Sequence, residues 1–435
     1  MKDLTNRQVS IHILHAEPKG DIGVTAAQRA LYKILLENSI DLSVSTPNSE
    51  IFKLTHPESK DMKVYRPLIP SIGNRNIYNH IQWIIFTAFN LTLLTFMAPL
   101  IQIGVKFSSR IDVIDRMRKC DAFIDLNLEL IRGIPISVSP ALIKQEPKVL
   151  VIHKLFWSFR ILQNLWFLLI VKSIFKKKLI VGPASFGPFN GLPIIIKWLT
   201  KIILNRFVDL VLVREPCSAK LLDKLGVKNY QTVADVVILT RAERSSHSPI
   251  PFKPAIGVVP AMLRYTLTKE EIEKYVVAHA RCLDELATKY EEVVFLPSSS
   301  NDIVMCQMIM ARMKNAYRAK IIITDSVDEY ESLIRRLKLL ITTRMHPSII
   351  ASRNFIPFLS IIYDHKQVGF LLQIGAKAFS IPIQQTSYDN LQLTINKVIQ
   401  SYDKIKENLK STVPKLQDAL TTTLLHSVNF IRKYQ

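Results

Sequence analysis

The feature that most constrains the fold is a regular alternation of short apolar runs with helical segments after residue 254. Each run is rich in β-branched residues and is followed by a stretch with helical spacing of its apolar residues. Alternation of this kind predicts an α/β fold with a parallel, doubly wound sheet. From residue 388 onward, amphipathic helical pattern dominates, interrupted by Pro414. The strands are expected at 255–260, 292–297, 320–324, 338–343 and 357–363.

The first half of the chain predicts a second sheet. A strand is expected at 9–16, followed by a short loop with Gly20 and Gly23 and then a helix. The polar, proline-rich segment 240–254 is the best linker candidate. Two α/β domains joined by a linker predict a cleft between them, where substrates commonly bind. Further strands are expected at 122–126, 149–153, 179–182 and 209–214.

The charge balance favours anionic partners. The 435 residues include 57 Lys and Arg against 36 Asp and Glu, a formal net charge of +21. Nucleic acid is the weaker choice, since the sequence has no zinc-finger spacing, RNA-recognition motif or long basic block. The four cysteines are far apart in sequence, and the first residues lack the apolar core of a secretory signal. These features favour reduced thiols and a cytoplasmic protein.

Two apolar stretches raise the question of a membrane. Residues 81–105 contain no charged residue and are long enough to span a bilayer, whereas the apolar core of 155–171 is expected to be too short. A single crossing would put strands of one sheet on opposite sides of the bilayer. A buried helix or an in-plane contact with an anionic membrane is therefore favoured over a true span, and the aromatic residues flanked by lysines favour peripheral association.

The strand expected at 338–343 ends at Arg344 and His346, and Pro347 then opens a helix. Open α/β sheets bind ligands at the carboxyl ends of their strands. The free N–H groups at a helix N-terminus attract anions, and an imidazole titrates near neutrality. One cation, one proton-transfer group and one helix N-terminus thus predict a site for a phosphate or carboxylate substrate.

Three other strand ends carry side chains that suit an anion or a sugar. Arg214 follows one strand, Ser298 and Ser299 follow another, and Lys366 follows a third. Ser185 lies in a loop rich in Gly and Pro that could bring backbone N–H groups near a ligand. Structural alternatives stay open for three of these sites: a surface or structural Arg for Arg214, a helix cap for Ser298 and Ser299, and a simple turn for the loop of Ser185. No cluster has metal-ligand spacing, so the chemistry is expected to rest on Arg, His and Lys without a metal.

Together these motifs resemble the polysaccharide pyruvyl transferase family. The resemblance covers roughly residues 179–382 well and the first third poorly; the paired glycines of many members are missing after the strand at 122–126. The matching motifs are Gly182–Phe189, Arg214–Val227, Ala234–Val236, Arg344 with His346, Tyr363–Lys366 and Gly369 with Phe370.

The resemblance implies two Rossmann-like domains in a GT-B-like arrangement: an acceptor domain at 1–247, a donor domain at 248–385, and C-terminal helices at 386–435. It implies an enzyme without cofactor that uses phosphoenolpyruvate as co-substrate to form a pyruvate ketal on a sugar. The acceptor would be a cell-surface polysaccharide or a lipid-linked glycan. His346 and Arg344 would be catalytic.

By the same resemblance, Arg214 and Arg344 would bind the carboxylate and phosphate, and Lys366 would add charge neutralisation. The three serines named above would help to bind substrate. Two other functions stay open: a two-domain glycosyltransferase that uses a nucleotide sugar, and a membrane-associated assembly factor without catalysis.

Overall fold

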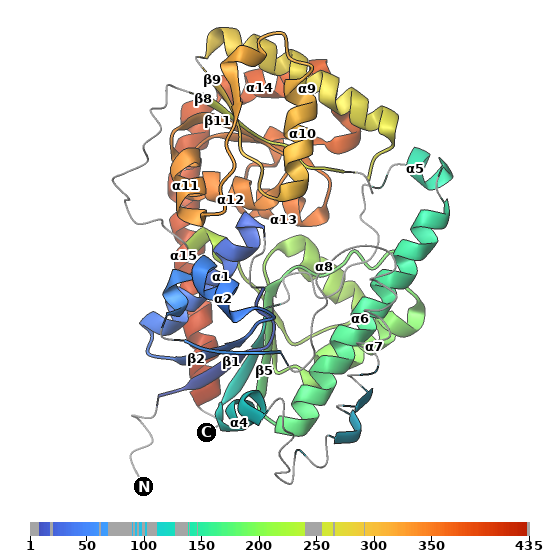
Figure 1. Ribbon diagram of the computed structural model, residues 1–435, viewed down its shortest axis with the longest axis vertical. Helices are drawn as coiled ribbons and strands as arrows, with labels where there is room; N and C mark the ends of the chain where they lie inside the picture. Colours follow the sequence, from blue (N-terminus) through green and yellow to red (C-terminus); the bar gives the residue numbers. More distant parts are fainter. Residues whose placement is uncertain are drawn as a thin grey trace.

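The computed structural model has two lobes, each built on a parallel sheet, with one long helix running along both (Figure 1). It describes residues 8–17, 21–60, 62–67, 89, 92–93, 95–97, 101, 111–126, 138, 140–145, 147–239, 255–263, 266–290 and 292–432. The predicted linker at 240–254 and most of the apolar stretch 81–105 lie outside the described residues.

The first sheet has seven parallel strands in the order β3-β2-β1-β4-β5-β6-β7. Its central strands are fully buried, because helices cover both faces. Its strands are β1 (Ser10–Ile13), β2 (Asp41–Ser45), β3 (Lys63–Tyr65), β4 (Ala122–Asp125), β5 (Lys178–Ala184), β6 (Leu210–Val213) and β7 (Tyr230–Thr232). Its helices are α1 (Ile22–Glu37), α2 (Ser49–Thr55), α4 (Ile111–Lys119), α5 (Pro140–Gln145), α6 (Pro147–Phe175), α7 (Ile194–Phe207) and α8 (Pro216–Leu225).

The second sheet has six parallel strands in the order β10-β9-β8-β11-β12-β13. The alternation of apolar runs and helical segments after residue 254 therefore predicted the parallel sheet of the second lobe correctly. Its strands are β8 (Ala255–Val259), β9 (Glu292–Phe295), β10 (Ala319–Ile321), β11 (Leu337–Thr342), β12 (Phe358–Ile362) and β13 (Ser380–Pro382). Its helices are α9 (Lys269–Lys289), α10 (Ser300–Met310), α11 (Val327–Arg335), α12 (Met345–Arg353), α13 (His365–Gln373) and α14 (Tyr388–Gln400).

The strand expected at 149–153 is wrong, because these residues belong to α6. The β-branched residues of this run favour a strand locally, but they continue a helix of 29 residues. The helix packs through Ile161, Leu165 and Leu168 on the core of the first lobe. Tertiary packing has thus overridden local preference.

The expectation that the second apolar stretch, 155–171, is too short to span a bilayer is also wrong. By length and composition alone, Trp157–Phe175 is the one helix among the described residues that could cross a membrane. Of its most apolar stretch, 56% is buried against the rest of the protein. Leu155, Leu162 and Trp166 are exposed on the outer side of α6.

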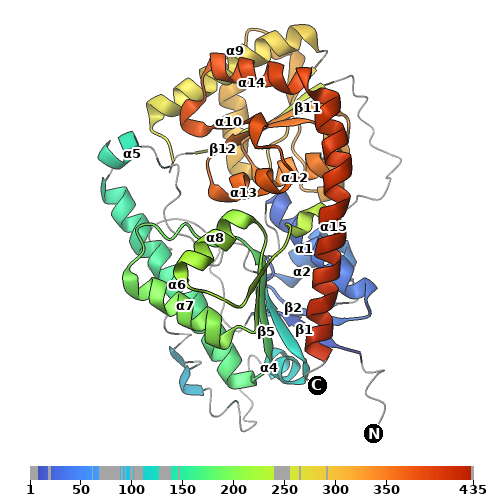
Figure 2. The same ribbon diagram turned by 180° about the vertical axis from the view of Figure 1, so that it is seen from behind.

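The expected interruption at Pro414 is also wrong. Helix α15 (Tyr402–Arg432) runs through Pro414 for 31 residues. Its buried residues lie on both sides of the proline, Leu409 before it and Leu420 after it, so packing outweighs the lost backbone hydrogen bond. The end of α15, at Val428 and Ile431, packs on the first sheet, and the view from behind shows it passing both lobes (Figure 2).

Candidate active site

The carboxyl ends of the two sheets face each other, and the start of α1 contacts the second lobe. The backbone N–H of Ile22, at the start of α1, donates to the carbonyl of Ser298 after β9 at 3.2 Å. The backbone of Gly23 lies against the ring of His346, so closely that a Cβ on this glycine would fall 1.8 Å from Nδ1. These contacts place the start of α1 beside the start of α12.

His346 occupies the centre of this contact. Its side chain is 14% exposed, and its Nε2 makes no hydrogen bond within the described part of the chain. Oδ2 of Asp235 lies 3.9 Å from Nε2. Burial lowers the pKa of His346, the carboxylates of Asp235 and Asp21 oppose that shift, and Arg214 and Lys366 add to it. The imidazole is therefore neutral at pH 7, with one nitrogen available to a substrate.

Arg214 reaches the same carboxylate from the first lobe. Its Nη1 donates to Asp235 at 2.9 Å, and its Nε donates to the hydroxyl of Ser185 at 2.7 Å. All three side chains are buried. Ser185 thus positions Arg214, and Asp235 joins Arg214 to the neighbourhood of His346. The substrate-binding roles assigned to Arg214 and Ser185 stay predictions, because the guanidinium is paired within the protein here.

Arg344 is held in a similar way by the second lobe. Its Nε donates to Asp302 at 3.0 Å, its Nη2 donates to the other oxygen of that carboxylate at 2.5 Å, and Nη2 also reaches Ser299 at 3.5 Å. Ser298 donates to Asp302 at 3.3 Å. The arginine side chain remains 24% exposed and serves as the N-cap residue of α12. Arg344, Ser298 and Ser299 therefore form one cluster beside the start of α12.

Two helix N-termini open into this cluster without a side-chain cap. The N-cap residues Arg344 of α12 and Ser299 of α10 make no capping hydrogen bond through their side chains. Uncapped first turns present N–H groups and the positive end of the helix dipole. Together with the nearby cations, they form a place where an anion is favoured.

Lys366 lies in the first turn of α13, the next helix along this edge, and its side chain is buried. Its charge acts on His346. The side chain of Asp364 caps this helix and contacts Nδ1 of His365 at 2.7 Å. The position of Lys366 agrees with the expected cluster, whereas its role toward a substrate stays a prediction.

A buried polar network next to Lys366 ties the two lobes together. Nε2 of His365 lies 3.1 Å from the carbonyl of Phe186 and 3.8 Å from Glu215, the N-cap residue of α8. Burial raises the pKa of Glu215, while hydrogen bonds from Ser218 and the charge of His365 oppose the shift. Gly369 of α13 allows this approach, since a Cβ there would fall 2.1 Å from Oε2 of Glu215.

The strand-end motifs therefore indicate the cations and the histidine but not their acidic partners. Asp21, Asp235 and Asp302 lie in or beside the same motifs, but no role was predicted for them. The strand-end rule could have found Asp235, which follows β7, and Asp302, which lies in the helix after β9. Among the described residues, no group of three or more His, Cys, Asp or Glu side chains is placed to hold a metal ion.

The architecture, with two parallel sheets in two lobes, is GT-B-like. A UDP-N-acetylglucosamine 2-epimerase from Neisseria meningitidis, solved with UDP-GlcNAc, has a TM-score of 0.58 at 10% identity and covers 97% of this chain and 99% of its own. HepE from Anabaena, solved with UDP-glucose, has a TM-score of 0.51 at 9% identity and covers 98% and 100%. At these identities the likeness concerns the fold alone.

The family follows from the sequence match. The family model for polysaccharide pyruvyl transferase matches residues 108–365, and the chain belongs to that family. The amylovoran biosynthesis protein AmsJ of Erwinia amylovora is 23% identical over 278 residues, which are 57% of this chain. The match spans 64% of the length of AmsJ. The resemblance carried by the strand-end motifs is thereby confirmed.

Proposed function

We propose that this protein transfers pyruvate from phosphoenolpyruvate to two hydroxyls of one sugar, forming a pyruvate ketal on a cell-surface polysaccharide or its lipid-linked precursor. The observation that carries the proposal is the unbonded Nε2 of a largely buried, neutral His346 between the two lobes, near cations and uncapped helix N-termini. Membership of the pyruvyl transferase family supports the reaction class.

The charges near His346 suit phosphoenolpyruvate, which carries a carboxylate and a phosphate. Arg344 is partly exposed, and its carboxylate partner Asp302 holds the guanidinium in place through Nε and Nη2. The uncapped turns of α10 and α12 add N–H donors beside it. Lys366 supplies a further positive charge near His346. These groups would hold the two anionic ends while the enol carbon faces the imidazole.

The reaction then needs a proton at the methylene carbon and two C–O bonds at its neighbour. A neutral His346 would take the proton of one sugar hydroxyl and pass it to the methylene carbon, which becomes the methyl group. The oxygen of that hydroxyl bonds to the central carbon. Phosphate leaves with the electron pair of its C–O bond, and the second hydroxyl closes the ketal. The second hydroxyl proton leaves with phosphate as HPO₄²⁻.

Phosphate release from phosphoenolpyruvate tests this proposal. The wild-type chain is incubated with p-nitrophenyl hexosides and either phosphoenolpyruvate or UDP-glucose, and release of phosphate or UDP is measured. We expect phosphate release alone, with a mass increase on the glycoside that matches a pyruvate ketal. His346→Ala should lower kcat by roughly 100-fold or more. UDP release, or near-normal turnover by His346→Ala, would contradict the proposal.

We also propose a peripheral contact with an anionic membrane, on the outer side of α6 and α7. These helices lie side by side in both views (Figures 1 and 2). On α7, Ile194 is 81% exposed and Trp198 is 55% exposed, and Leu155 of α6 is 67% exposed. Apolar side chains beside basic residues such as Lys197 favour an in-plane contact, and a membrane surface would present a lipid-linked acceptor to the enzyme.

Sedimentation with vesicles tests the membrane contact. The protein should sediment with phosphatidylglycerol vesicles more than with phosphatidylcholine vesicles, and salt or alkaline carbonate should release it. The double variant Ile194→Ser/Trp198→Ser should lose most of this binding. Leu393→Ser, at a 69% exposed position on α14, is the matched control and should bind normally. Retention after carbonate extraction would instead indicate a spanning helix.

A further inference from the structure

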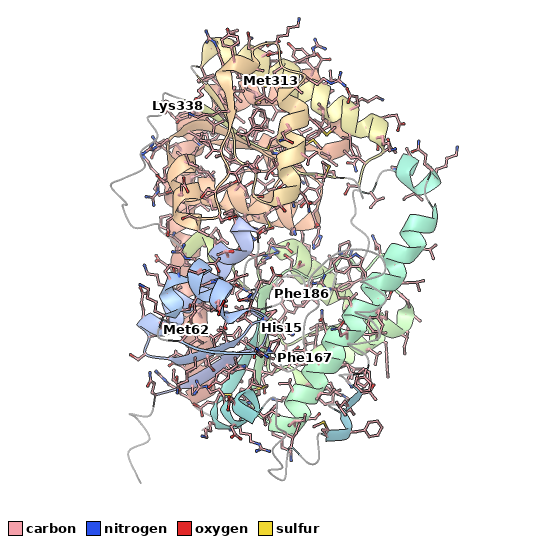
Figure 3. All side chains as sticks on the ribbon, viewed as in Figure 1. His15, Met62, Phe167, Phe186, Met313 and Lys338 are labelled. Carbon is pink, nitrogen blue, oxygen red and sulfur yellow. The ribbon has the colours of Figure 1, made fainter. Side chains whose placement is uncertain are left out.

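A second histidine lies at the same edge of the first sheet and has no part in the site described above. His15 follows β1, and its Nδ1 is 2.8 Å from Oδ1 of Asp125, the last residue of β4. The histidine side chain is 39% exposed, whereas the aspartate is 1% exposed. The ring packs on Phe167 of α6 with a centroid distance of 4.9 Å (Figure 3).

The arrangement fixes which ring nitrogen is available. The carboxylate of Asp125 accepts a hydrogen bond from Nδ1, so the neutral ring carries its proton there. Nε2 then has a lone pair and is the nitrogen free to accept a proton. A buried aspartate that holds an imidazole in this tautomer also fixes the orientation of the ring toward a substrate. The pair thus has the form of a proton acceptor.

A purely structural role fits His12 of the same strand much better than it fits His15. His12 is fully buried, and its two ring nitrogens contact the hydroxyls of Ser43 and Ser45 at 2.8 and 2.9 Å. Burial lowers the pKa of His12 to about 3. His15, in contrast, is only partly buried, and β1 and β4 are already joined by backbone hydrogen bonds such as that from Leu14 to Ile124.

We propose that His15, oriented by Asp125, forms the acceptor-sugar site on the first lobe and takes the proton of the second hydroxyl. This inference rests on the proposed function. The start of α1, the helix that follows β1 along the chain, lies with Asp21 and Gly23 beside His346. His15 and Asp125 stand at the carboxyl ends of β1 and β4, the neighbouring strands between which the order of the first sheet reverses, and open α/β sheets bind ligands there.

The proton balance of ketal formation gives His15 its task. Two hydroxyls lose a proton each, and His346 accounts for the one that reaches the methylene carbon. As the second hydroxyl oxygen bonds to the central carbon, Nε2 of His15 takes its proton. The phosphate departs with the electron pair of the broken C–O bond and accepts that proton to become HPO₄²⁻, which returns His15 to its neutral form.

The test compares His15→Ala, Asp125→Asn and the control His426→Ala, at an exposed position on α15. Phosphate release from phosphoenolpyruvate is measured with p-nitrophenyl hexosides, and thermal unfolding checks the fold. His15→Ala should lower kcat by about 100-fold or more while KM for phosphoenolpyruvate stays within about twofold. Added imidazole should restore at least a tenth of the lost rate, which a structural defect would not allow. His426→Ala should behave as wild type.

The outcomes separate this inference from the function on which it rests. If the wild-type chain is active and the turnover of His15→Ala is within threefold of it, the role of His15 is overturned. The proposed function then still stands. A loss that imidazole does not restore would also overturn the proton-acceptor role. If the wild-type chain releases no phosphate from phosphoenolpyruvate with any of the glycosides, the proposed function fails and the inference fails with it.

Discussion

Replacing Gly23 by alanine tests the contact that joins the two lobes at His346. Gly23 is the second residue of α1, where helix propensity alone favours alanine by about 1 kcal/mol. The structure predicts instead that alanine at this position destabilises the protein. A Cβ at this position would lie 1.8 Å from Nδ1, 2.1 Å from Cγ and 2.4 Å from Cβ of His346.

The size of the effect follows from these distances. The 1.8 Å approach is about 1.6 Å short of the 3.4 Å at which ordinary van der Waals contact begins, so the imidazole or the start of α1 must move by that order. Overpacking of this kind costs about 1–3 kcal/mol of stability. A displacement of about 1 Å at a reacting group costs about 100-fold in rate. Gly23→Ala should therefore lose both stability and turnover.

Urea unfolding and phosphate release from phosphoenolpyruvate measure the two effects. Gly257→Ala is the matched control, because a Cβ there would lie 2.2 Å from Cδ1 of Leu337 in the core of the second sheet. It should lose comparable stability and keep its activity per folded molecule. If Gly23→Ala is as stable as wild type, or if its kcat/KM is unchanged, the reasoning from this contact is refuted.

Three further variants test other parts of the structure. Arg214→Ala should lower the free energy of unfolding by about 3–5 kcal/mol in urea titrations, since it leaves Asp235 buried without its partner; a loss under 1 kcal/mol would contradict the ion pair. Burial lowers the pKa of His279 from 6.5 to about 4, so the unfolded chain takes up this proton first as the pH falls. His279 therefore costs about 1.4 kcal/mol of stability per pH unit between pH 6.5 and 4, and His279→Gln should flatten the measured slope by that amount; an unchanged slope would be inconsistent with a neutral buried ring. Gly369→Ala should displace Glu215 at the lobe contact and lower the melting temperature, whereas an unchanged melting temperature would show that the 2.1 Å approach is relieved without cost.

The long, strongly patterned elements were predictable from sequence. Strands β8, β9, β11 and β12 carry buried β-branched runs, and the helices between them have regular apolar spacing. The short strands β3, β7 and β13 were missed, because three residues carry too little pattern to be distinguished from loops. Strand β2, Asp41–Ser45, was missed since its polar residues dilute the apolar signal, although four of its five residues are buried.

The sequence by itself determined the chemistry available at the strand ends. Arg214, Arg344, His346 and Lys366 each stand directly after a strand or in the next helix turn, and a parallel sheet brings such positions to one edge. This information is local, because it needs only the order of apolar and polar residues along the chain.

Only the tertiary structure decided which partners those residues have. Asp235 pairs with Arg214 across 21 positions, Asp125 pairs with His15 across 110, and Gly23 meets His346 from the other lobe. No periodicity encodes such contacts, since they depend on how two sheets and their loops pack in space. The physical reason is that charge pairing and close approach are properties of distance, and distance between remote residues exists only once the chain is folded.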